Sequence, residues 1–217
     1  MYEKELEYVE EYLKSHNGED SPREFETFRK RSLHSKRVVK WLDRLIDDEI
    51  ASKLDSNTIK SIYLSAIFHD VGYGSEHYKN SHPIEGTEIW QNYAKGRYSD
   101  IIIDKVSYLI YNHQNKSLLS NSSTPLELIL LMEADILDEE GAMSILWDSM
   151  VLAHSNPTDY TYALDRIKQY SAHILACNPL RTQKGIKYWQ DKQKLVKGFI
   201  KALEFDLFIK EEWKLWI

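Results

Sequence analysis

The chain has very little cysteine: Cys177 is the single cysteine among 217 residues. An internal disulfide is therefore excluded, and a closed zinc site built from several thiolates is disfavoured. No pattern typical of a catalytic thiol surrounds Cys177, so we expect it to be a structural, buried or half-buried residue. Such sparse use of cysteine is typical of the reducing cytosol.

Long apolar runs are also missing, and we expect no leader peptide. No run approaches the roughly 18 apolar residues that a membrane span needs. The start of the chain, Met1-Tyr2-Glu3-Lys4-Glu5, lacks the basic residues and the apolar centre of a signal peptide. Hydrophobic residues make up 42% and charged residues 29%, which is typical of a globular chain. We therefore expect a soluble, cytoplasmic protein.

The sequence has no excess of positive charge. Its formal net charge of -6 at pH 7 argues against binding to a nucleic acid polymer or to an anionic membrane surface. A local basic patch would still suffice to hold a phosphate group, so small phosphate-bearing partners stay open.

Alternating strand patterns are absent, and almost every segment has helical periodicity, which predicts an all-α fold. We expect an N-terminal helix over residues 2–15 and a long helix that begins at Ser21-Pro22-Arg23-Glu24 and ends near Asp47. A third helix, capped by Ser56 or Asn57, should end at His69 and Asp70 and lead into a polar loop over 72–80. We assign residues 1–155 to one helical domain, with its core at about 25–147, and 156–217 to a two-helix extension packed on it.

Histidine and aspartate recur on the inward faces and at the ends of these helices. His34 lies one turn before Val38 on an apolar stripe, and His113 ends a helix whose apolar face it shares. Asp135 lies on the apolar face of a helix that begins near Pro125, and His82 stands where a helix begins. Each residue alone is readily explained as a satisfied core residue or a cap. Together with the adjacent pair His69-Asp70, they predict a buried metal site.

The order of these residues resembles that of the HD-domain superfamily of metal-dependent phosphohydrolases. The matching segments are H-S-K-R-V with His34, F-H-D-V-G with His69 and Asp70, and E-A-D-I-L-D with Asp135. The resemblance extends from about Phe25 to Trp147 and is greatest to the small bacterial HD hydrolases that include nucleotide pyrophosphohydrolases. It implies an HD-domain helical bundle.

The resemblance also implies a ligand set. The metal ligands would be His34, His69, Asp70 and Asp135, and the cofactor would be one or two divalent ions of Mn, Fe, Co, Ni, Zn or Mg. His82 and His113 occupy positions where related proteins bind a second metal or phosphate, with Asp70 as the bridge. Asp138 would either fix the orientation of a ligand or cap the helix that follows. A divalent ion in such a site lowers the pKa of bound water and neutralises phosphoryl charge.

One position departs from the family pattern. Several HD nucleotidases carry a glutamate shortly after the His-Asp pair, whereas this chain has Tyr73. Glu76 is the nearest replacement, and we list it with Asp70, His82 and His113 as candidate catalytic residues. The basic residues expected to contact the substrate phosphate are Arg37, Lys79, Arg181 and Lys184.

These inferences predict a metal-dependent phosphomonoesterase, phosphodiesterase or nucleotide pyrophosphohydrolase with a nucleotide-like substrate. Two alternatives stay open: a mixed-valent diiron oxygenase on the same scaffold, and a regulatory module that binds metal or nucleotide without turnover. The aromatic tail from Phe205 to Ile217 is typical of packing or of an oligomer contact, so a homodimer is a further expectation.

Overall fold

The computed structural model describes residues 2–16, 30–75, 78–155 and 159–209. Within these ranges the chain forms helices and no strand, which confirms the predicted all-α fold. No described helix combines the length and the apolar character needed to cross a bilayer. The chain divides into two compact units, Met1–Asp138 with Pro179–Gly185, and Glu139–Asn178 with Ile186–Ile217. This division falls earlier than the domain boundary expected after residue 155.

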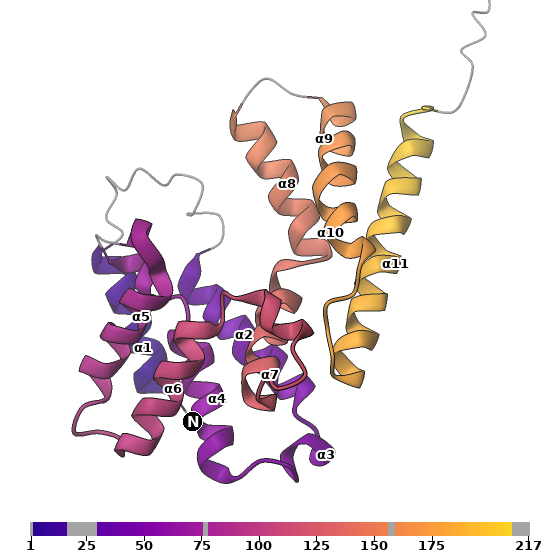
Figure 1. Ribbon diagram of the computed structural model, residues 1–217. Helices are drawn as coiled ribbons and strands as arrows, with labels where there is room; N and C mark the ends of the chain where they lie inside the picture. The colour runs from indigo at the N-terminus through magenta and orange to yellow at the C-terminus, as the bar shows by residue number, and fades with distance from the viewer. Residues whose placement is uncertain (1, 17–29, 76–77, 156–158, 210–217) are drawn as a thin grey trace, which may run out of the picture. The chain divides into compact units, whose positions relative to one another are not determined.

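The first unit contains most of the helices (Figure 1). Its elements in chain order are α1 (Glu3–His16), α2 (Arg31–Leu45), α3 (Asp48–Ala51), α4 (Ser56–Phe68), the 3-10 helix η2 (Val71–Gly74), α5 (Tyr78–Ala94), α6 (Asp100–Asn112), the 3-10 helix η3 (Lys116–Ser120) and α7 (Leu126–Glu139). Helix α4 packs against α2 and α6, and α5 packs against α6 and η2. The core around α4 is apolar and aromatic, with Phe68 and Trp90 buried edge to face.

The second unit is built from α8 (Ala142–Ser155), α9 (Tyr160–Ile167), the π-helix η4 (Lys168–Ala172), α10 (His173–Ala176) and most of α11 (Gln183–Asp206). Helix α8 packs on α9 and η4. The buried Asp148 of α8 accepts hydrogen bonds from the backbone N–H and the hydroxyl of Ser171 in the π-helical turn. Cys177, which follows α10, is exposed, so the expectation of burial for this residue was wrong.

Several helix boundaries differ from the predicted ones. The long helix expected from Pro22 begins at Arg31, because Lys30 has φ 45° and a left-handed residue cannot continue a right-handed helix. The predicted start at Ser21-Pro22 lies outside the described residues. Helix α4 is capped by Asp55 instead of Ser56 or Asn57, because the Asp55 carboxylate accepts a hydrogen bond from the Thr58 N–H at 2.9 Å.

The segment after the His-Asp pair is not a simple polar loop. Val71–Gly74 form the 3-10 helix η2, and Val71, Gly72 and Gly74 are buried. A Cβ atom at Gly72 would lie 2.0 Å from the carbonyl oxygen of His82 and 2.6 Å from the amide nitrogen of Gly86. This close backbone approach requires glycine and fixes η2 against the beginning of the regular part of α5, which follows the extended Ser81.

Candidate metal centre

Helix α4 ends at the centre of the first unit and delivers His69 and Asp70 there. His69 is completely buried at the end of α4. Its Nδ1 lies 2.9 Å from the carbonyl oxygen of Ala66, which accepts the Nδ1–H bond. The same arrangement holds at the end of α6, where His113 Nδ1 lies 2.6 Å from the carbonyl oxygen of Ile110. In both imidazoles the Nε2 lone pair is therefore left to bind a ligand.

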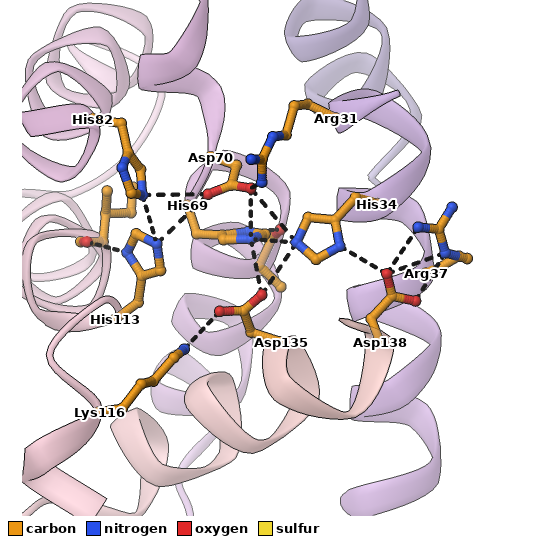
Figure 2. A network of polar contacts seen from close by, with 12 residues as sticks. Arg31, His34, Arg37, His69, Asp70, His82, His113, Lys116, Asp135 and Asp138 are labelled. Atoms are coloured by element: carbon orange, nitrogen blue, oxygen red, sulfur yellow. Dashed lines mark hydrogen bonds and ion pairs between the residues drawn. The ribbon is translucent and has the colours of Figure 1, made fainter. Parts of the chain in front are cut away.

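Four side chains, one each from α2 and α7 and two from the residues that follow α4, converge on one point. We call them the primary group: His34, His69, Asp70 and Asp135 (Figure 2). His34 Nε2 lies 3.1 Å from His69 Nε2, 3.1 Å from Asp135 Oδ1 and 3.5 Å from Asp70 Oδ2. His69 Nε2 lies 3.6 Å from Asp70 Oδ2 and 3.7 Å from Asp135 Oδ1. All four residues are buried.

The primary group fits a divalent cation. Nitrogen and oxygen ligands at about 2.1 Å from an ion lie roughly 3.0–3.4 Å from one another. The measured separations of 3.1–3.7 Å are close to this spacing. Imidazole nitrogen and carboxylate oxygen without sulfur suit the ions of the Mn, Fe, Co, Ni and Zn group. The primary group can therefore hold a divalent cation.

The second carboxylate oxygen of Asp70 faces another pair of imidazoles, which we call the His82–His113 pair. Asp70 Oδ1 lies 3.4 Å from His82 Nε2 and 3.6 Å from His113 Nε2, and the two Nε2 atoms are 3.2 Å apart. Asp70 therefore offers Oδ2 to the primary group and Oδ1 to the His82–His113 pair. This geometry is what a carboxylate bridge between two ions requires.

The imidazoles differ in protonation. Burial lowers the pKa of His34, but its hydrogen bonds with Asp135 and Asp138 outweigh burial and raise the pKa to about 10. Burial lowers the pKa of His69 to about 4 and that of His82 to about 3. His69 and His82 are therefore neutral at pH 7, which is the form of histidine that binds metal ions.

Two positively charged side chains, Arg31 and Lys116, contact the aspartates of the site, although neither was predicted from the sequence. Arg31 Nη1 lies 2.5 Å from Asp70 Oδ2, and Lys116 Nζ lies 2.6 Å from Asp135 Oδ2. Burial raises the pKa of both carboxyls, but the Arg31 guanidinium beside Asp70 and the Lys116 ammonium beside Asp135 hold both pKa values well below the usual value. Both carboxylates are therefore ionised and ready to bind a cation.

Asp138 supports His34 from behind. Its Oδ2 accepts a hydrogen bond from His34 Nδ1 at 2.7 Å, and Arg37 donates to both Asp138 oxygens through Nε at 2.8 and 3.1 Å. This is the position predicted for Asp138. Arg37 was expected to contact substrate phosphate, but its guanidinium lies against Asp138 on the far side of His34 (Figure 2).

A model of the HD domain family matches residues 31–140, just over half of the 217-residue chain. The chain belongs to the HD domain family. The matched range contains all six residues of the primary group and the His82–His113 pair, the adjacent His69 and Asp70 included. A search of curated proteins found no match.

Solved structures share the fold of this HD-domain protein. A predicted HD superfamily hydrolase from an uncultured Thermotogales bacterium has a TM-score of 0.60 at 18% identity, over 94% of this chain and 92% of that one. The Lin1889 protein from Listeria innocua has a TM-score of 0.60 at 23% identity, over 97% and 99% of the two chains. A protein from Lactobacillus plantarum has a TM-score of 0.54 at 16% identity, over 96% and 99%.

The remaining residues predicted to contact phosphate lie elsewhere. The Arg181 guanidinium donates to the carbonyl oxygen of Asn121 at 2.9 Å, and Lys184 pairs with Asp47 at 3.2 Å. The backbone N–H groups of Arg181 and Thr182 donate to the buried carboxylate of Glu133. Glu133 and Asp135 are two residues apart on α7, so their side chains project about 200° apart. The segment of Arg181 and Thr182, which we call the connector, therefore lies on the face of α7 opposite the primary group.

The connector has a structural role at the beginning of α11. The Thr182 hydroxyl accepts a hydrogen bond from the Gly185 N–H at 3.0 Å and so caps this helix. The Arg181 and Lys184 side chains are thus engaged in other contacts, and phosphate binding by either residue stays a prediction. Glu76 lies outside the described residues. The backbone of Lys79 belongs to α5, and its side chain is likewise outside the described part.

Addition of Mn²⁺ to the HD-domain protein is expected to raise the midpoint of thermal unfolding. The primary group assembles only in the folded chain, so a cation at 100 times its Kd stabilises the fold by about 2.7 kcal/mol. For a chain of 217 residues this corresponds to a rise of roughly 5–10 °C. Differential scanning calorimetry with and without Mn²⁺, with Ca²⁺ as a control, measures it; an unchanged midpoint at saturating Mn²⁺ contradicts a cation site.

Proposed function

We propose that the protein is a divalent-metal-dependent phosphohydrolase that cleaves a phosphoester or phosphoanhydride bond of a nucleotide-like substrate. The observation that carries the proposal is the convergence of His34 Nε2, His69 Nε2, Asp70 Oδ2 and Asp135 Oδ1 in a buried site of an HD domain. When bound, a divalent ion supplies an activated water nucleophile and neutralises charge on a phosphoryl oxygen.

The charge balance of the site favours an anionic substrate. Three carboxylates, Asp70, Asp135 and Asp138, are each paired with one cation, Arg31, Lys116 and Arg37 respectively. His34, with its pKa raised to about 10, adds a positive charge in the metal-free site. A divalent cation that takes the place of the His34 proton leaves a larger excess of positive charge in a buried place. A phosphate group restores the balance, and Arg31 and Lys116 are the two cations next to the primary group that are placed to hold its oxygens.

The other residues of the site have defined roles in this proposal. Asp138 orients His34 through its Nδ1, and the carbonyl oxygens of Ala66 and Ile110 orient His69 and His113. The His82–His113 pair, with Asp70 Oδ1, binds a second cation or a phosphate oxygen. Cytoplasmic location and a homodimer remain part of the proposal, as does the exclusion of nucleic acid polymers as substrates.

The proposal is tested by a release assay. The protein is stripped with a chelator and reloaded with Mn, Fe, Co, Ni, Zn or Mg. Release of phosphate and pyrophosphate from nucleoside mono-, di- and triphosphates is then measured. We expect release that requires the metal. Nucleotide binding without release under every metal would instead favour a regulatory module.

A diiron oxygenase is the second candidate, favoured by the bridging geometry of Asp70 between the primary group and the His82–His113 pair. Its signature is a spin-coupled iron pair with oxygen uptake and no phosphate release. Electron paramagnetic resonance of the iron-loaded protein, together with an oxygen electrode, discriminates between the two enzyme classes.

Replacement of Arg31 by alanine is expected to raise KM roughly ten- to hundredfold and to change kcat less. A hydrogen bond to a charged group contributes about 1.5–3 kcal/mol, and this contact would be lost with the substrate phosphate. Steady-state kinetics on the best substrate measures the split. Arg97→Ala, which removes a cation that lies over the Tyr93 ring, is the matched control. An unchanged KM in Arg31→Ala removes Arg31 from the substrate contacts.

A further inference from the structure

We infer that Tyr73 is a positioning residue of this site, and that its ring holds the His82 imidazole on one face and the Arg31 guanidinium on the other. The inference rests on the proposed function, because positioning has a consequence only where cations and phosphate bind. Tyr73 stands in η2, three residues after Asp70.

The three side chains form a stack. The Arg31 guanidinium carbon lies 4.0 Å from the centre of the Tyr73 ring. The Tyr73 and His82 rings are 4.1 Å apart between centroids, with an angle of 16° between their planes. A flat cation over one face and a parallel aromatic ring over the other are both favourable contacts for a tyrosine ring.

Both outer members of the stack reach the same carboxylate. Arg31 Nη1 contacts Asp70 Oδ2 at 2.5 Å, whereas His82 Nε2 lies 3.4 Å from Asp70 Oδ1. Tyr73 therefore sets the distance between a phosphate-binding cation and a histidine of the His82–His113 pair. Asp70 lies between them at the centre of the site.

His82 differs from the other imidazoles in how its ring is oriented. His34, His69 and His113 each use Nδ1 in a hydrogen bond, to Asp138, Ala66 and Ile110 respectively. Among the described residues no comparable partner faces Nδ1 of His82, and the close contact of its ring plane is with Tyr73. Stacking thus does for His82 what a hydrogen bond does for the other three.

The backbone holds Tyr73 in place. Gly72, the preceding residue, lies so close to the His82 carbonyl oxygen that a Cβ atom there would be 2.0 Å away. The turn that carries Tyr73 and the beginning of the helix that carries His82 are therefore locked together. This backbone approach places the Tyr73 side chain next to His82.

The test compares Tyr73→Leu, which removes the ring, with Tyr73→Phe, which removes only the hydroxyl. Tyr111→Leu, at an exposed tyrosine of α6, is the control. In the metal-free protein, NMR of the His82 ring protons reports the stack directly, since a parallel ring shifts these signals upfield. Isothermal titration of the Mn²⁺-loaded protein with inorganic phosphate reports the consequence.

We expect Tyr73→Leu to lose the upfield shift and to bind inorganic phosphate about tenfold more weakly, which is the loss of one desolvated cation–ring contact. Tyr73→Phe should restore both, and Mn²⁺ stoichiometry should be the same in all variants. Wild-type shift and phosphate affinity in Tyr73→Leu would overturn the inference. So would an equal loss in Tyr73→Phe, because the hydroxyl and not the ring would then be responsible.

Failure of the Tyr73 inference and failure of the proposed function can be told apart. If the wild-type protein releases no phosphate from any nucleotide, the hydrolase assignment fails. The His82 ring shift and the affinity for inorganic phosphate still decide whether Tyr73 positions these two groups.

Discussion

Replacement of Asp70 by asparagine is expected to lower kcat/KM about a thousandfold or more while leaving the helical content unchanged. Asp70 Oδ2 lies 3.5 and 3.6 Å from the Nε2 atoms of His34 and His69, and Oδ1 lies 3.4 and 3.6 Å from those of His82 and His113. The two oxygens of Asp70 are thus divided between the primary group and the His82–His113 pair. A metal ion contributes several kcal/mol to catalysis, and about 4 kcal/mol corresponds to a thousandfold.

Asparagine has nearly the same shape, so the packing around position 70 is kept. Its amide N–H₂ group would face imidazole nitrogens or Arg31 in place of an ionised oxygen, and the charge that attracts a cation is lost. Circular dichroism checks the fold, and turnover of the best substrate measures the effect. Asp104→Asn makes the same chemical change at an exposed position of α6 and is the matched control. Turnover equal to wild type in Asp70→Asn would remove this residue from the catalytic site.

Replacement of Asp138 by asparagine is expected to weaken Mn²⁺ binding about ten- to hundredfold, which is the usual cost of removing a residue that orients a metal-binding histidine. The Asp138 carboxylate accepts from His34 Nδ1 at 2.7 Å and so fixes the ring whose Nε2 belongs to the primary group. Burial lowers the pKa of His34, and the hydrogen bond with Asp138 counteracts this effect by raising that pKa.

Isothermal titration with Mn²⁺ measures this loss. Arg37→Ala, which removes the partner of Asp138 on the far side of His34, should have a smaller effect of the same sign, because Asp138 would still accept from His34. The control is again Asp104→Asn. Wild-type affinity in Asp138→Asn would show that His34 does not depend on this hydrogen bond.

The histidines and aspartates of the site could be predicted from the sequence because helical periodicity fixes their direction. His34 and Asp135 lie on apolar faces, so packing those faces against α4 turns both residues toward His69. Arg31 carries the same signal, since it precedes His34 by three residues on the same helix face, and it was overlooked. Because the sequence predicted a longer helix from Pro22, it did not indicate that α2 begins at Arg31.

Contacts made by short irregular segments could not be predicted in this way. Lys116 reaches Asp135 from the 3-10 helix η3, and Tyr73 meets His82 because η2 approaches α5 at Gly72. Neither segment has a period from which a side-chain direction follows. The contacts of Arg181 and Lys184 were missed for a related reason: the sequence gives their charge but does not show that Glu133 binds the connector on the other face of α7, where Thr182 caps α11.

The most direct test of the central claim is the metal content of the chelator-stripped and Mn²⁺-reloaded protein, compared between the wild type and Asp70→Asn by elemental analysis after gel filtration. We expect the wild-type chain to retain one or two Mn²⁺ ions and Asp70→Asn to retain almost none. Equal metal content in the two proteins, or no bound metal in the wild type under any of the candidate ions, would contradict it.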